Sequence, residues 1–428
     1  MSLTGQFEKR SAGPHVATIV RKPRLFFAAM ALALVVLACG ESNAEDPAET
    51  TTSPASSDPP ATSTTVEGSG AVPELTLSTA PDWQVTALGR GVKPALDLDE
   101  DDLPAVAWIL ERRGGFIAFA SLADSWDQET VFEGYFYGPI DLAFDPENRP
   151  NIVIHDHQAD TFREELGDLV RLTRSDSGWA VDTAESPGHD GWDSTVEISE
   201  DGVVHAAGVD PSQFGRVEGV EYYRNEGDGW DVTQVGSGPI PYQYNVSLAL
   251  SPSGSPALTY YNDSEMDLIY AVLDGSDWQF ELVDAQGDVG KFSSLAFDAE
   301  GQPHVTYFSQ ASPSQGAIVY ATRMGERWTA ETVGRIEAFS EPNARRNSAI
   351  DFDVSGNPHV VFSDTSGVWY STRSEDGWET RMIVEAGSGP LGQLVSFQLD
   401  DDDTPHIALY EVTNEAELDG LVAYLTTG

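Results

Sequence analysis

Hydrophobic and polar residues alternate over short runs along most of the chain, with turn residues between the runs. Ser293–Phe308, SSLAFDAEGQPHVTYF, contains one alternating run, an Asp/Gly turn and a second run that begins with Pro. Alternation with a period of two predicts strands, Asp and Gly favour turns, and Pro is tolerated at the first residue of a strand. This stretch therefore predicts a pair of strands joined by a tight turn.

The same pattern occurs seven times. The copies read ALDLDEDDLPAVAW, DLAFDPENRPNIVI, TVEISEDGVVHAAG, SLALSPSGSPALTY, SLAFDAEGQPHVTY, AIDFDVSGNPHVVF and SFQLDDDDTPHIAL. One position, here called the Pro column, aligns them: Pro104, Pro150, Val204, Pro256, Pro303, Pro358 and Pro405. Its spacing of roughly 50 residues is typical of repeat architectures such as propellers.

Each copy continues into a third apolar run and a fourth run that starts with tryptophan. These tryptophans are Trp83, Trp126, Trp179, Trp230, Trp278, Trp328 and Trp378. Each repeat is therefore predicted to be a four-stranded meander. One meander cannot bury both of its apolar faces alone, so the copies must stack in an open solenoid or a closed ring.

The two ends of the repeat region favour the ring. It opens with a tryptophan strand alone, DWQVTAL around Trp83, and closes with a third-type strand, GLVAYLTTG, that has no tryptophan strand after it. Docking the first strand onto the last repeat completes seven units and removes the exposed sheet edges. We predict an all-β fold: a seven-bladed β-propeller of four-stranded blades, closed by an N-terminal outer strand on the last blade.

The repeats resemble the tandem SLALDxxGxPHxxY motifs of many bacterial and archaeal surface proteins, over about Pro81 to Gly428. The resemblance implies a propeller of a superfamily with sialidase-like and lectin-like members. The resemblance says little about a catalytic activity. The SEDGW turn at Ser374–Trp378 is too short for the aspartate box of sialidases.

The segment before the repeats has a different composition. Basic residues precede an apolar stretch, Leu25–Leu37, of 13 residues, which is too short for a stable transmembrane helix and typical of a secretory signal. Cys39, the only cysteine, follows it, and VLAC resembles the lipobox of bacterial lipoproteins, whose cysteine is acylated. An ordinary signal peptide with an incidental cysteine is the alternative.

A Ser/Thr/Pro-rich acidic stretch comes next, with too few large apolar residues to build a core. We therefore expect a signal peptide at 1–38, a disordered linker at 39–78 and the propeller at 79–428. The expected location is the bacterial cell envelope, with the protein lipid-anchored on the extracytoplasmic side of the membrane. We expect a monomer.

Charge excludes one class of partner. The chain has 23 Lys and Arg against 70 Asp and Glu, a formal net charge of −47, which repels nucleic acid. Metalloprotease, phosphate-loop and nucleophile-elbow motifs are missing from the sequence. Four histidines repeat directly after the Pro column (His205, His304, His359 and His406), so we expect them to pack and hydrogen-bond in every blade.

No cofactor is expected, although acidic turns of the first and last repeats are weak Ca²⁺ candidates, since clustered carboxylates suit this ion. The carboxylates concerned are Asp97, Asp99, Asp101, Asp400 and Asp402. An EF-hand would need Gly and Glu where this chain has Asp102 and Trp108, so solvated turns are the competing interpretation.

Residues that depart from the repeat at one end of the ring are the candidates for ligand binding. Twelve positions before the Pro column, the candidates are Trp192, Tyr244, Lys291, Arg346 and Gln393. Six positions after it, they are Asp156, Asp210 and Asp364, which could instead cap turns. Stacking aromatics beside a few cations suit an acidic sugar. The competing interpretation is that the aromatics plug the channel.

Two function classes stay open, and a third is not excluded by the sequence. The first is a tethered module that binds a glycan or a cell-surface protein on this face. The second is a glycan hydrolase or lyase that uses Asp or Glu as acid and base. The sequence shows no clear Tyr/Glu nucleophile pair of the sialidase type. A passive envelope scaffold is the third.

Overall fold

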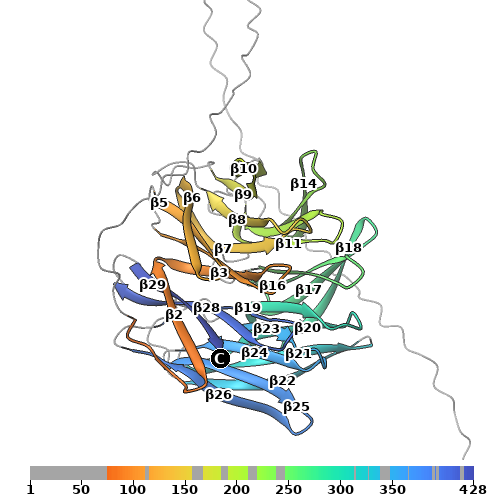
Figure 1. The fold of residues 1–428 in the computed structure, drawn as a ribbon. Helices are drawn as coiled ribbons and strands as arrows, with labels where there is room; N and C mark the ends of the chain where they lie inside the picture. The colour runs from red at the N-terminus through yellow and green to blue at the C-terminus, as the bar shows by residue number, and fades with distance from the viewer. Residues whose placement is uncertain are drawn as a thin grey trace, which may run out of the picture. The chain divides into compact units, whose positions relative to one another are not determined.

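The computed structural model describes residues 75–428, apart from 111–114, 157–166, 185–190, 211–218, 238–245, 313–314, 326, 338–347, 365, 388–390, 392–394 and 415–418. The predicted signal segment, Cys39 and most of the predicted linker lie outside these residues. Within the described part of the chain, the secondary structure is all strand, in seven antiparallel sheets arranged as a ring (Figure 1).

Each sheet is one blade, and its strands run from the central channel outward. The inner strands are β3 (Val92–Leu98), β7 (Phe136–Phe144), β11 (Trp192–Ile198), β15 (Val246–Leu250), β19 (Asp288–Phe297), β23 (Ser348–Phe352) and β27 (Ser396–Leu399). The second strands are β4 (Pro104–Ile109), β8 (Pro150–Asp156), β12 (Val204–Asp210), β16 (Pro256–Asn262), β20 (Pro303–Ser312), β24 (Pro358–Ser363) and β28 (Pro405–Asn414). All seven second strands begin on the Pro column, as predicted.

The outer half of each blade follows the same order. The third strands are β5 (Gly115–Leu122), β9 (Asp168–Ser175), β13 (Gly219–Asn225), β17 (Asp267–Asp274), β21 (Gln315–Met324), β25 (Gly367–Ser374) and β29 (Asp419–Thr427). The outer strands are β6 (Trp126–Gly134), β10 (Gly178–Ala184), β14 (Trp230–Ser237), β18 (Asp277–Asp284), β22 (Arg327–Glu337), β26 (Gly377–Glu385) and, for blade 7, β2 (Trp83–Arg90). Blades 1 to 7 are numbered by their inner strands in chain order.

The N-terminal strand closes the ring, which confirms the predicted topology. β2 pairs antiparallel with β29, the last strand of the chain, from Trp83 opposite Thr427 to Arg90 opposite Leu421. Blade 7 is thus built from both ends of the repeat region. The fold class is confirmed as a seven-bladed β-propeller.

The residues just before β2 also belong to the propeller. The short strand β1 (Ser78–Thr79) pairs with β26 as a fifth strand of blade 6. The backbone N–H of Thr76 donates to the buried carboxylate of Glu411 at 2.9 Å, and Leu75 and Leu77 pack on the same core cluster as Trp83. The contacts of the propeller therefore include a few residues that the sequence prediction assigned to the linker at 39–78.

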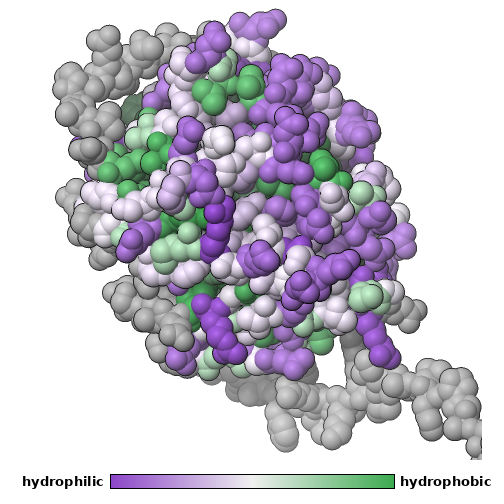
Figure 2. All heavy atoms as spheres, turned by 60° about the horizontal axis from the view of Figure 1, so that its bottom comes forward, coloured by the Kyte–Doolittle hydropathy of each residue, from purple (hydrophilic) through white to green (hydrophobic). Residues whose placement is uncertain are grey.

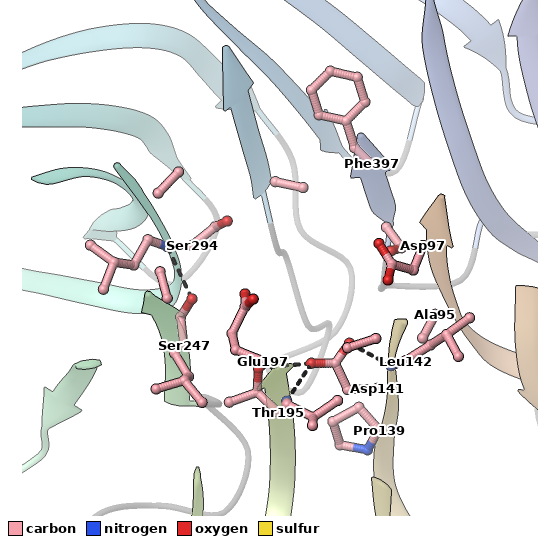
Figure 3. A pocket seen from close by; sticks show the side chains of 18 of the residues that line it. Ala95, Asp97, Pro139, Asp141, Leu142, Thr195, Glu197, Ser247, Ser294 and Phe397 are labelled. Atoms are coloured by element: carbon pink, nitrogen blue, oxygen red, sulfur yellow. Dashed lines mark hydrogen bonds between the residues drawn. The ribbon is translucent and has the colours of Figure 1, made fainter. Parts of the chain in front are cut away.

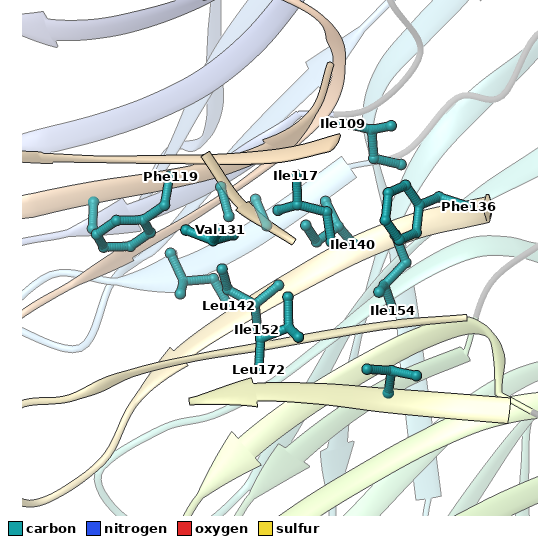
Figure 4. Packing of buried hydrophobic residues seen from close by; sticks show 14 of the residues in the cluster. Ile109, Ile117, Phe119, Val131, Phe136, Ile140, Leu142, Ile152, Ile154 and Leu172 are labelled. Carbon is teal, nitrogen blue, oxygen red and sulfur yellow. The ribbon is translucent and has the colours of Figure 1, made fainter. Parts of the chain in front are cut away.

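The hydrophobic core lies between neighbouring blades. One cluster joins Ile117 and Phe119 of blade 1 to Ile152 and Leu172 of blade 2 (Figure 4). The tryptophans that open the outer strands complete these boundaries: Trp278 meets Tyr222 of the preceding blade edge-on at 5.2 Å between ring centroids. The outer surface is mostly hydrophilic on the face in Figure 2, with apolar residues in separate patches.

The repeated histidines have the predicted structural role. Nδ1 of His205, His304 and His406 lies 2.5–2.6 Å from the hydroxyl of a tyrosine on the third strand of the same blade, and His359 makes the same contact. Burial lowers the pKa of His205 to about 4, so this imidazole is neutral at pH 7.

Candidate functional site

The two described residues of the predicted stacking and cationic set are buried. Trp192 is 8% exposed, and its ring packs against His155 at 5.0 Å between centroids. Lys291 is 6% exposed, and its Nζ donates to Asp288 at 2.6 Å and to Gln310 at 2.7 Å. Neither side chain presents an open face to a ligand in this structure, so Trp192 and Lys291 are not placed as an exposed binding pair.

A β-bulge explains this placement. The register of β11 with β12 shifts between Trp192 and Thr195, and Asp193 has a positive φ of 51°. Bulges re-aim side chains. The equivalent shift in β19 lies between Lys291 and Ser294. At these two bulges Trp192 packs in the apolar cluster between blades 3 and 4, and Lys291 is buried with its Nζ bonded to Asp288 and Gln310.

The other predicted residues fall into two groups. Asp156 accepts a hydrogen bond from the backbone N–H of Tyr135 at 2.9 Å, and Asp364 accepts from the N–H groups of Ser366 and Gly367. Both carboxylates thus cap backbone, which was the competing interpretation. Tyr244, Arg346 and Gln393 lie outside the described residues, as does the side chain of Asp210.

The weak Ca²⁺ candidates are mainly turn residues. Oδ1 of Asp99 accepts from the N–H groups of Asp101 and Leu103, and Asp400 holds its own turn in the same way. Asp97 lies apart from them in the channel. Among the residues that the structure describes, no group of three or more acidic, His or Cys side chains is arranged to hold a metal ion.

A polar cavity of about 400 Å³ occupies the central channel (Figure 3). Residues from all seven inner strands line it. Its charged lining residues are all acidic: Asp97, Asp141, Asp193, Glu197 and Asp351. Such an arrangement disfavours anions and makes the ionisation of each carboxyl costly, because the neighbouring groups carry the same charge.

Most of the polar side chains in the channel join neighbouring blades. A backbone N–H of one inner strand donates to a side chain on the inner strand of the preceding blade; we call this a cross-boundary bond. These bonds run from Leu96 to Ser396 (3.0 Å), Leu98 to Gln398 (3.0 Å), Phe144 to Asp97 (2.7 Å), Val196 to Asp141 (2.9 Å), Leu295 to Ser247 (3.0 Å), Ile350 to Ser294 (3.4 Å) and Leu399 to Asp351 (2.8 Å).

Glu197 departs from this pattern. It stands seven positions before the Pro column, as do Asp97, Asp351 and Gln398, while three other blades have Ala there. Within the described part of the chain its carboxyl group makes no hydrogen bond, and it projects into the cavity in Figure 3. The sequence pattern singled out Asp97 alone, although this column already contained the signal for the others.

Burial shifts the acidity of the channel carboxyls. It raises the pKa of Asp97 and Asp351 to about 6, and it also raises the pKa of Asp141. Burial and then the charges of Asp141, Asp97 and Asp351 raise the pKa of Glu197 to about 8. At pH 7 the Glu197 carboxyl is therefore mainly protonated and neutral.

The two ends of the propeller differ in the length of their connections. The turns between first and second strands are all five residues long: 99–103, 145–149, 199–203, 251–255, 298–302, 353–357 and 400–404. The connections between second and third strands, at the opposite end, range from 313–314 to 157–167. We call this variable end the top face. It also receives the connections between blades.

Known proteins share the fold and little sequence. No protein-family model matches the chain, and no curated protein matches its sequence. An ulvan lyase of polysaccharide lyase family PL25, bound to -[GlcA(1-4)Rha3S]-, matches with a TM-score of 0.52 and 10% identity, over 78% of this chain and 93% of that one. At this identity the likeness shows the propeller fold alone.

Two fungal proteins are also similar. The α-L-arabinofuranosidase Arb93A of Fusarium graminearum has a TM-score of 0.49 at 11% identity, over 68% of this chain and 92% of that one. AofleA of Arthrobotrys oligospora has a TM-score of 0.46 at 11% identity, over 73% of this chain and 91% of that one. Glycan-acting hydrolases and lyases are thus among the structural neighbours.

Proposed function

We propose that this protein is a membrane-tethered, extracytoplasmic β-propeller that binds a glycan or a cell-surface protein on its top face. The variation in connection length at that face supports the proposal. Seven turns of one length mark the opposite face as scaffold, whereas the connections of the top face differ in length from blade to blade. Loops of this kind, held by a rigid framework, commonly carry binding functions.

The use of the channel carboxylates favours binding over catalysis. Hydrolysis of a glycosidic bond commonly needs two carboxyl groups that flank the bond, one as acid and one as base or nucleophile. Asp97, Asp141 and Asp351 each accept backbone hydrogen bonds across a blade boundary. These hydrogen bonds give three of the described channel carboxylates a structural role in joining the blades. A hydrolase or lyase remains the alternative, and a passive envelope scaffold a third.

The proposal of a membrane tether is based on the sequence. The apolar segment Leu25–Leu37 and the adjacent Cys39 support a lipid anchor in the bacterial cell envelope. Within the described residues, no helix is long and apolar enough to cross a bilayer. The test is membrane fractionation of the wild type and Cys39→Ala. We expect the wild type in the membrane fraction and the variant released from it; recovery of both in one soluble fraction contradicts the anchor.

Binding is tested by altering each face in turn. Wild type is screened on a glycan array that includes acidic sugars and against extracted cell-surface proteins. A top-face variant replaces residues 157–167 with a short turn. The matched control replaces the turn 251–255 with the sequence of 298–302, which has the same length. Both variants are first checked for an unchanged melting temperature.

We expect ligands of the wild type to be retained by the control and lost or weakened at least tenfold by the top-face variant. Loss on the control with retention on the top-face variant would move the site to the opposite face. Failure of the wild type to bind anything in either screen favours the scaffold hypothesis.

A further inference from the structure

One blade boundary lacks the bonds that join the others in the channel. Cross-boundary bonds connect blades 7 and 1, 1 and 2, 2 and 3, 4 and 5, 5 and 6, and 6 and 7. Between blades 3 and 4, the described inner strands β11 and β15 form none. The hydroxyl of Thr195, the channel residue before Glu197, donates back to Asp141 of blade 2 at 2.8 Å.

The chain itself shows what a bond at this boundary would look like. Acceptors at the position of Glu197 bond the N–H that lies six positions before the Pro column of the next blade: Gln398 bonds Leu98, and Asp97 bonds Phe144. The equivalent N–H of blade 4 is that of Leu250. Gln398 has the same side-chain length as Glu197, so a neutral amide of this reach serves as an acceptor.

Charges face Glu197 from several strands, and those in the cavity are all negative. β3 contributes Asp97, β7 Asp141 and β23 Asp351, and each raises the cost of ionising Glu197. Its own strand contributes the buried Asp193. The three groups on other strands come from blades 1 and 2, on one side of blade 3, and from blade 6 across the channel.

The remaining neighbours of Glu197 are uncharged. His205 lies opposite it in the register of β12, but this imidazole is bonded to Tyr222 and neutral at pH 7. β15, the strand across the boundary, is Val-Ser-Leu-Ala-Leu and has no titratable group. β19 and β27 line the cavity with neutral side chains such as Ser294, Ser396 and Gln398. No cation lies in the described lining to offset a charge on Glu197.

We propose that the boundary between blades 3 and 4 is a pH-sensitive seam of the ring, which ionisation of Glu197 loosens. The neutral carboxyl is tolerated in the acidic channel. Its anion is repelled by the carboxylates of blades 1, 2 and 6, and no bond between the described inner strands β11 and β15 resists the displacement of β11 that this repulsion favours. The propeller would then open first at one defined place as the pH rises.

The direction of the effect follows from proton linkage. Folding raises the pKa of Glu197, so its stabilising contribution is present at pH values below the ordinary glutamate pKa and is lost as the pH rises through about 8. Asp97 and Asp351, with pKa values of about 6, act mainly at lower pH. Burial also raises the pKa of Asp141, so the contribution of Glu197 between pH 6 and pH 8 is taken as the difference between the wild type and a variant that lacks Glu197.

The test is hydrogen exchange measured by mass spectrometry on the whole soluble propeller. Wild type, Glu197→Gln and the control Glu200→Gln, which neutralises an exposed acid in the adjacent turn, are compared between pH 6 and pH 8. Rates are corrected for intrinsic base catalysis with unstructured peptides. Exchange of β11 and β15 reports the seam. Exchange of β27 and β3 reports the boundary between blades 7 and 1, which has two cross-boundary bonds and is called the doubly bonded boundary.

In the wild type and the control, we expect the opening equilibrium of β11 and β15 to increase on the order of tenfold per pH unit. In Glu197→Gln this dependence should disappear, and β27 and β3 should change little in any variant. If Glu197→Gln folds poorly, Glu197→Ala replaces it, because Ala143, Ala249 and Ala296 occupy this position in other blades.

The proposal is overturned if β15 opens equally at both pH values in the wild type. It is also overturned if the variant that lacks Glu197 keeps the same pH dependence, or if the pH-dependent opening appears at β27 and β3 instead.

Discussion

The boundary between blades 7 and 1 and the boundary between blades 3 and 4 carry different side chains at the same two positions of the repeat. At the first, Ser396 and Gln398 each accept an N–H from β3, and the amide of Gln398 also donates to Asp97 at 2.7 Å. At the second, Thr195 bonds backward and Glu197 makes no bond within the described residues. Repetition therefore specifies where a polar side chain can join two blades, and the individual residue decides whether it does.

Apolar packing joins the blades at the less bonded boundary, as it does at the other boundaries. Tyr222 of blade 3 meets Trp278 of blade 4, and Val209, Val246 and Leu258 belong to one buried cluster there. Apolar contact is not directional, whereas a buried hydrogen bond fixes register. The comparison teaches that, among the described inner strands, one boundary relies on apolar packing and the others combine packing with specific bonds.

The largest expected effect comes from removing the strand next to the doubly bonded boundary. Deleting Asp82–Leu88 removes most of β2, the partner of β29, and with it the buried Trp83, whose loss alone costs about 3–5 kcal/mol. We expect loss of cooperative unfolding or a large fall in melting temperature, measured by calorimetry. Deleting 41–73 should change the melting temperature little; equal effects of the two deletions would contradict closure by β2.

A smaller effect is expected from Gln398→Ala. Ala occupies this position in three other blades, so the backbone accommodates it, but the N–H of Leu98 and one oxygen of Asp97 lose their partner. The expected loss is about 1–3 kcal/mol in the free energy of unfolding, measured in urea at pH 7. Gln279→Ala, at an exposed glutamine, is the control. A loss no larger than the control's would show that the second bond is dispensable.

The variant Glu197→Asp should strengthen the boundary between blades 3 and 4. Asp97 and Asp351 show that Asp at the position of Glu197 accepts the next N–H. Glu197→Asp is therefore expected to raise the free energy of unfolding by about 0.5–1.5 kcal/mol at pH 5, relative to Glu197→Ala, in urea titrations. If Asp is no better than Ala, the strands at this boundary are too far apart for the bond.

The smallest expected effect concerns His205 at the acid end. Folding lowers its pKa to about 4, so its contribution to stability is present above the ordinary histidine pKa and is lost as the pH falls from about 6.5 to about 4. His205→Gln should flatten the melting temperature over this range relative to wild type. The two proteins should differ least in slope above pH 7. Parallel profiles throughout would assign the acid sensitivity to other groups.

The sequence predicts the propeller well because its determinants are local and repeated. Pro, Gly and Asp set the turn after each inner strand, and the spare strand at Trp83 matches the missing strand after β29. These features do not depend on a long-range contact being known in advance. The repeated histidines were equally predictable, since one residue at one position in four blades must satisfy the same local geometry.

The candidate site was harder to predict because a bulge changes the direction of side chains. Counting positions places Trp192 and Lys291 at the mouth of the channel, but next to the register shifts in β11 and β19 Trp192 packs in a core cluster and Lys291 is buried against Asp288 and Gln310. Counting does place Glu197, Asp141 and Asp351 on the inner strands. Whether each carboxyl is bonded depends on the neighbouring blade, about 50 residues away in the chain, and no local pattern encodes that.

The pairing of β2 with β29 also has a consequence for biosynthesis. β2 is among the first parts of the propeller to be made and its partner β29 is the last of its strands, so the ring cannot close until Thr427 has been made. A product that stops before Asp419 leaves β2 and β28 with unpaired edges, which invite aggregation and proteolysis. The order of strands thus makes closure of the ring depend on synthesis through the end of β29.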